Sequence, residues 1–173
     1  MELLELKDAV LGIFGTDIDH LGDALMDAVK NNKTELYDKF CELVDDDLSE
    51  DYLQKIFQYY HADREEKKQD YTPKSIASFM GMLIGESDVV TDMCAGSGAL
   101  TIQRWNDNHN QKFYLFELDE KVMPFLLFNL AVRNIDANVC RADVLTDTQY
   151  EQWRISKGEK YGRLTYFKST VQS

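Results

Sequence analysis

Residues 89–101 read Val-Val-Thr-Asp-Met-Cys-Ala-Gly-Ser-Gly-Ala-Leu-Thr, and this stretch decides the fold of the 173-residue chain. A β-branched run leads into small residues and two glycines, and an apolar helical pattern follows. A strand that turns at once into a helix needs residues without bulk, and Gly96 and Gly98 permit backbone conformations barred to other residues. Small side chains also leave the first N–H groups of the helix open to a ligand. We therefore predict a strand, a ligand-binding glycine turn and a helix.

The chain after this turn alternates between strand and helix patterns. Strands are predicted at residues 88–93, 112–117, 138–140 and 163–167, and helices from the turn to about residue 108, from residue 119 or 120 to 134, and around 147–156. Such alternation is typical of right-handed βαβ units around a parallel sheet. We predict an α/β, Rossmann-like domain with a parallel sheet, preceded by a small helical N-terminal region.

Residues 1–70 are predicted to form this acidic helical region, and residues 71–173 the α/β domain, which is incomplete. Thr16, Thr34 and Ser49 can each cap a helix whose apolar residues recur on one face. The first region carries 19 acidic and 8 basic side chains, and the second carries 12 and 11. The acidic surface is interpreted as a solvated helix face, which is favoured, or as a docking surface for another subunit.

Composition excludes several classes of protein. No apolar run reaches the length of a membrane span, and the first residues lack the basic region of a signal peptide. Three scattered cysteines form neither a disulfide framework nor a zinc cluster. We expect a cytoplasmic protein with no membrane and no metal partner. Because no Lys/Arg stripe is present, DNA or RNA binding would depend on a larger complex or a missing segment.

A second helix start lies shortly before the glycine turn. Tyr71-Thr72-Pro73 places a capping threonine before a proline at the first helical position. Apolar residues then follow at the spacing of one buried helix face: Ile76, Phe79, Met80, Leu83 and Ile84.

Acidic residues fall at the ends of three successive predicted strands. They are Asp92, Glu117 and Asp143. Ligands of open α/β sheets lie beyond the carboxyl ends of the strands, and an acid 19 residues past Gly98 is placed to accept ribose hydroxyls. A dinucleotide site would want a third glycine where Thr101 stands. S-adenosylmethionine fits better, because its ammonium group can use Asp92.

The motif at residues 92–98 resembles the cofactor motif of S-adenosylmethionine-dependent DNA methyltransferases of the adenine-N6 class. Together with residues 71–73 it is similar to the modification subunits of type I restriction–modification systems, although Met93 stands where that family usually has proline. The resemblance covers about residues 70–145 and implies S-adenosylmethionine as the cofactor. The cofactor-binding residues that it implies are Tyr71, Thr72, Pro73, Asp92, Cys94, Ala95, Gly96, Ser97, Gly98, Glu117, Leu118, Asp143 and Val144.

The family's catalytic tetrapeptide, Asn/Asp-Pro-Pro-Tyr/Phe, is absent. It activates the adenine amine and stacks on the flipped base. The chain has only two prolines, Pro73 and Pro124, and residues 168–173 stand where the tetrapeptide is expected. No catalytic residue is therefore assigned, and the chain is interpreted as truncated before this motif. A naturally short protein, a shortened one and a fragment completed by another chain all fit.

Three functions stay open. The first is the cofactor-binding portion of an adenine-specific DNA N6-methyltransferase, which has lost or borrows its catalytic motif. The second is a non-catalytic interaction module of a restriction–modification complex. The third is an RNA methyltransferase-like or other adenosine-binding protein. The first is favoured for ancestry and cofactor site, and the possible partners are DNA and a restriction–modification subunit.

Overall fold

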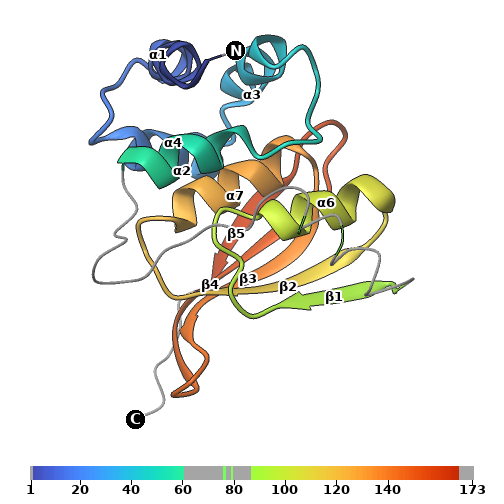
Figure 1. The fold of residues 1–173 in the computed structure, drawn as a ribbon. Coiled ribbons are helices and arrows are strands. Elements are labelled where there is room, and N and C mark those ends of the chain that lie inside the picture. Colours follow the sequence, from blue (N-terminus) through green and yellow to red (C-terminus); the bar gives the residue numbers. More distant parts are fainter. Residues whose placement is uncertain (1, 61–75, 77–78, 80–86, 168–173) are drawn as a thin grey trace.

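The computed structural model describes residues 2–60, 76, 79 and 87–167 of the chain (Figure 1). Its elements are α1 (Leu3–Phe14), α2 (Leu21–Lys30), α3 (Thr34–Leu43), α4 (Tyr52–Tyr60), β1 (Val89–Asp92), α6 (Ala99–Asp107), β2 (Lys112–Glu117), α7 (Met123–Val132), β3 (Asp136–Asp143), β4 (Thr148–Ser156) and β5 (Arg163–Phe167). Within these residues, no helix combines the length and the hydrophobicity needed to cross a membrane.

The α/β prediction is confirmed, with one correction to the sheet. Five strands form one sheet in the order β1-β2-β3-β4-β5. Strands β1, β2 and β3 are parallel neighbours joined by α6 and α7, as the strand–helix alternation predicts. Strands β4 and β5 are antiparallel to their neighbours, so the sheet is mixed rather than parallel.

The helix predicted around residues 147–156 is wrong, because this segment is strand β4. Asp147 has φ of 55° in a tight turn, and the chain then runs back along β3. In the second half of β4, the buried Trp153 and Ile155 alternate with the partly exposed Arg154 and Ser156. A period of two is the signal of a strand with one buried face, and the polar composition of the segment obscured it.

Helix α7 lies at the centre of the molecule, between the sheet and the N-terminal helices (Figure 1). All ten of its residues are buried. A helix that is hydrophobic on all sides is covered on all sides. Phe128 makes edge-to-face contacts with Phe14, Tyr37 and Phe40 of the N-terminal helices, at 5.3–5.4 Å between ring centroids. The N-terminal helices and the sheet therefore share one hydrophobic core.

The N-terminal region is helical as predicted, but its boundaries differ. Helix α1 was not predicted, and α2 begins at Leu21 rather than at Thr16. Helix α4 begins at Tyr52, and the side chain that caps it is Asp51, whose Oδ1 accepts the Gln54 N–H at 2.9 Å. The capping role predicted for Ser49 is therefore wrong.

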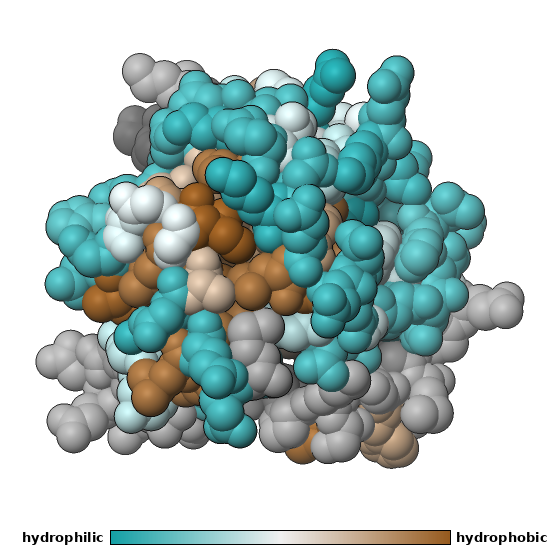
Figure 2. Space-filling view, turned by 90° about the horizontal axis from the view of Figure 1, so that it is seen from above, coloured by the Kyte–Doolittle hydropathy of each residue, from teal (hydrophilic) through white to brown (hydrophobic). Residues whose placement is uncertain are grey.

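The outer face of the N-terminal helices is mostly hydrophilic. Figure 2, which views the molecule from above, shows hydrophilic side chains around a patch of hydrophobic ones. The partly buried hydrophobic residues of α1, α2 and α3 are Leu3, Leu11, Phe14, Met26, Leu36 and Leu43.

Of the helix predicted after Pro73, the structure describes Ile76 and Phe79. Both are helical, but their relative exposures are 51% and 56%, so the prediction that they face the core is wrong. The predicted cofactor residues Tyr71, Thr72 and Pro73 lie outside the described residues.

Candidate functional site

The glycine turn connects β1 to α6 and has the backbone that its sequence predicts. Gly96 and Gly98 have φ of 55° and 100°, in the left-handed region that favours glycine. A Cβ on Gly98 would also lie 3.0 Å from Leu126 Cδ1 of α7. The Ala95 N–H donates to the Phe116 carbonyl at 2.9 Å and fastens the turn to the end of β2. The left-handed backbone therefore favours glycine at position 98, and the close approach of Leu126 adds to this preference.

Asp92 ends β1 and begins the turn. Its Oδ1 accepts the Cys94 N–H at 3.0 Å. Its Oδ2 is buried and accepts no hydrogen bond from the residues that the structure describes. Burial raises the pKa of Asp92, against the opposing effect of the Cys94 N–H. Buried polar atoms are normally paired, so an unpaired carboxylate oxygen here indicates a site for a hydrogen-bond donor or a cation.

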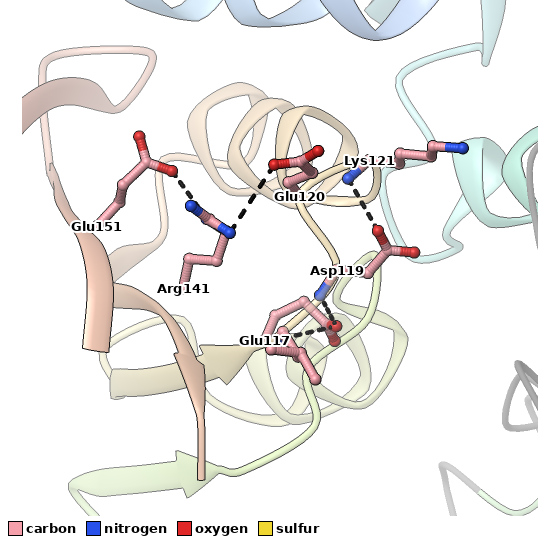
Figure 3. Close-up of polar contacts among 7 residues, drawn as sticks. Glu117, Asp119, Glu120, Lys121, Arg141 and Glu151 are labelled. Atoms are coloured by element: carbon pink, nitrogen blue, oxygen red, sulfur yellow. Dashed lines mark hydrogen bonds and ion pairs between the residues drawn. The ribbon is translucent and has the colours of Figure 1, made fainter. Parts of the chain in front are cut away.

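Glu117 ends β2 and lies against the glycine turn. Its Oε2 accepts the Gly96 N–H at 2.8 Å. Its Oε1 accepts the N–H groups of Leu118 and Asp119, both at 2.8 Å (Figure 3). The carboxylate therefore connects the end of β2 to the turn by accepting backbone hydrogen bonds from both.

The three strand-end acids are staggered along the sheet edge. The register pairs Asp92 with Leu115 and Glu117 with Arg141. Measured along the strand direction, Glu117 thus lies two residues beyond Asp92, and Asp143 lies two residues beyond Glu117. Such a diagonal row suits an extended ligand that runs across the strand ends.

Asp143 is the least connected of the three. Its Oδ1 accepts the N–H groups of Leu145 and Thr146 at 3.0 and 3.3 Å, which opens the turn into β4. No hydrogen bond or ion pair described in the structure joins it to Asp92 or Glu117. Arg141 lies level with Glu117 on the neighbouring strand β3, two residues before Asp143. Its Nε donates to Glu151 at 2.8 Å, and its Nη1 lies 3.8 Å from Glu120 (Figure 3). Sequence analysis missed Arg141 because its partner Glu151 lies on the mispredicted strand β4.

Some of the remaining predicted cofactor-binding residues are buried and others are exposed. Ala95, Ser97 and Gly98 are buried, so a ligand would meet chiefly their backbone. Leu118 and Val144 are exposed to 52% and 37%, and such apolar side chains can cover one side of a planar ring. Cys94 is exposed, but partial burial, Glu117 and Asp92 raise the pKa of its thiol. A thiol that stays protonated is a poor nucleophile.

Sequence analysis also missed Asp51, which holds the turn from outside. Its Oδ2 accepts the Ser97 hydroxyl at 2.7 Å, and its Oδ1 accepts Asn129 Nδ2 at 2.8 Å. Asn129 Nδ2 also donates to the Ser97 carbonyl at 2.9 Å. The available signal was an aspartate three residues before Gln54, the spacing of a capping box, within a run that resembles an acidic loop.

The chain matches a known protein family. The family model described as N-6 DNA Methylase matches residues 43–160, which include Asp51, the glycine turn and all three strand-end acids. Neither the search of curated proteins nor the search of solved structures gave a match.

Proposed function

Because the chain belongs to the N-6 DNA methylase family, we propose that it binds S-adenosylmethionine at the glycine turn and serves adenine-N6 methylation of DNA. The observation that carries this proposal is the buried, unpaired Oδ2 of Asp92 beside the turn. An unpaired carboxylate oxygen fits a ligand with an ammonium group. It does not fit the pyrophosphate of a dinucleotide, which would repel it.

The residues present suit this cofactor in a definite order along the sheet edge. Asp92 and the backbone of the turn would hold the methionine end, and Glu117 would hold the ribose. Leu118, Asp143 and Val144 would surround the adenine ring. The same site would hold the demethylated product, S-adenosylhomocysteine, because these groups do not touch the transferred methyl.

Glu117 must exchange partners to hold both ribose hydroxyls. A carboxylate offers about four acceptor positions. Three N–H groups already occupy three of them, so two hydroxyls exceed what remains. We propose that the ligand displaces the Gly96 N–H, which then becomes free to bind the ligand itself. Cofactor binding and a local change of the turn would therefore occur together.

Catalysis requires groups that this chain lacks. When bound, the cofactor supplies an electrophilic methyl group on sulfur. Transfer also needs a flipped adenine whose amine is held and made reactive. With two prolines far apart, the chain has no Asn/Asp-Pro-Pro-Tyr/Phe motif. We propose that this motif and most of the contacts to DNA come from outside residues 1–173, for example from a subunit of a restriction–modification complex.

A non-catalytic interaction module is the second candidate, because residues 1–173 hold no Asn/Asp-Pro-Pro-Tyr/Phe motif. Incubation of the chain with radiolabelled cofactor and mixed-sequence DNA is expected to give no label in adenine. Label above the no-protein background would contradict both the borrowed motif and the non-catalytic module.

Isothermal titration calorimetry tests the cofactor proposal directly. We expect binding of S-adenosylmethionine and S-adenosylhomocysteine, and none of NAD. Ligand at 100 times its Kd should add about 2.7 kcal/mol to the free energy of unfolding.

Glu117→Gln should weaken binding by roughly 1.5–3 kcal/mol, the scale of a hydrogen bond to a charged group. Glu120→Gln is the matched control, because Glu120 is an exposed acid on the same loop. Binding of NAD alone would overturn the proposal.

A further inference from the structure

We infer that Asp51 is a positioning residue for the glycine turn, so that the N-terminal helical region forms part of the ligand site. The consequence for affinity rests on the proposed function, whereas the effect on the turn does not. Ser97 stands between Gly96 and Gly98 in the turn. Both glycines adopt positive φ, and such residues by themselves leave a turn loosely determined.

Ser97 is fixed at two points by groups from outside the turn. Its hydroxyl donates to Asp51 Oδ2 at 2.7 Å, and its carbonyl accepts Asn129 Nδ2 at 2.9 Å. The same Asn129 Nδ2 donates to Asp51 Oδ1 at 2.8 Å and closes the triangle. Side chain and backbone of one residue are thus both held, which determines the conformation of the two glycines beside it.

Asp51 is itself held rigidly. The Gln54 N–H donates to its Oδ1 at 2.9 Å, and Arg133 ties the preceding segment to α7 through the carbonyls of Leu48 and Glu50, at 2.8 and 2.6 Å. Asp51, Ser97, Asn129 and Arg133 are all at least nine-tenths buried. Hydrogen bonds of a satisfied network away from water are strong and specify one arrangement. The position of the turn therefore depends on the segment that precedes α4.

A hydrogen bond with a purely structural role would also connect the N-terminal region to the α/β region, and the chain contains one that serves for comparison. Asn106 Nδ2 of α6 donates to the Ser49 carbonyl at 2.9 Å. This bond links the same two parts of the chain, but it lies at the far end of α6 from the turn. Asn106→Ala is therefore the matched control for variants at Asp51 and Ser97.

Hydrogen–deuterium exchange of the ligand-free chain tests the inference. We expect Asp51→Ala and Ser97→Ala to speed exchange in the peptide that covers residues 93–100 about tenfold, the scale of one lost hydrogen bond of about 1.4 kcal/mol. Asp51→Asn should keep wild-type exchange there, because the Ser97 hydroxyl can reverse and accept from the amide. Asn106→Ala should leave this peptide unchanged. If Asp51→Ala does not fold, Ser97→Ala decides.

Affinity gives the second readout. Asp51→Ala should weaken S-adenosylhomocysteine binding roughly tenfold, although Asp51 touches no predicted ligand atom, and Asn106→Ala should not. Equal exchange of the turn in Ser97→Ala and Asn106→Ala would overturn the inference, as would unchanged affinity in Asp51→Ala. If the wild-type chain binds no cofactor, the proposed function fails while the exchange comparison still decides the role of Asp51.

Discussion

Asp51 and Asp92 are two carboxylates withdrawn from water on either side of the same turn, and their surroundings differ. Asp51 accepts three hydrogen bonds, from Ser97, Asn129 and Gln54, and Arg133 lies close enough to favour its charged form. Asp92 accepts one, from the Cys94 N–H, and its second oxygen has no partner among the described residues. Burial raises the pKa of both side chains.

The difference separates a structural carboxylate from a binding one. A buried charge with a complete set of donors stabilises one conformation, and removal of any donor leaves the rest unpaired. A buried charge with an unpaired oxygen destabilises the protein until a ligand supplies the donor. Residues held in such unfavourable states are expected at functional sites. The Asp51 side of the turn should therefore matter most for folding, and the Asp92 side most for binding.

Arg133→Met gives the largest expected effect. Burial lowers the pKa of Arg133 to about 10, so it remains charged at neutral pH. Its loss leaves Asp51 without an opposite charge and the carbonyls of Leu48 and Glu50 without their donors. We expect urea unfolding to show a loss of about 3–5 kcal/mol. Arg163→Met, at an exposed position, should change stability by less than about 0.5 kcal/mol. Similar losses in both variants would contradict the structural role of the Asp51 side.

Much of the fold was predictable from sequence because its signals are local. The β-branched run, the two glycines and the residues that end β1 and β2 lie within 30 residues of one another, and β2 was predicted to the residue. The contact of Glu117 with the turn follows from parallel pairing alone. The roles predicted for Asp143, Leu118 and Val144 stay predictions, because no ligand contact tests them.

What the sequence did not reveal depends on distant partners. Asp51 is 46 residues from Ser97 and 78 from Asn129, and nothing in the acidic run around it indicates that it is buried. Helix α7 shows no strong amphipathic pattern because helices cover it on the side away from the sheet. Strand β4 has a polar sequence and becomes a strand because β3 and β5 pair with it on both sides.

Asp92→Asn should separate binding from stability. The amide keeps an acceptor for the Cys94 N–H but loses the charge that would attract an ammonium group. We expect calorimetry to show S-adenosylmethionine binding weakened by roughly 1.5–3 kcal/mol. Thermal unfolding of the ligand-free variant should occur at the wild-type midpoint or above it, since an unpaired buried charge is gone. The matched control is Asp88→Asn, an exposed acid before β1, which should change neither quantity. A destabilised Asp92→Asn that binds normally would make Asp92 a structural residue like Asp51.

The pH dependence of the same variant gives the smallest effect. Because the pKa of Asp92 is raised in the folded protein, its protonated form is favoured by folding. The stabilisation is therefore present at acidic pH, below the unfolded pKa, and is lost as pH rises through the folded pKa. Wild type should thus lose stability relative to Asp92→Asn across that window, while titrations common to both proteins cancel. Affinity for S-adenosylmethionine should change in the opposite sense and rise with pH as Asp92 ionises, and this rise should be absent from Asp92→Asn. Urea unfolding and calorimetry from acidic to neutral pH measure both quantities. A stability difference that is flat with pH would show that Asp92 is paired in solution, and the contrast with Asp51 would disappear.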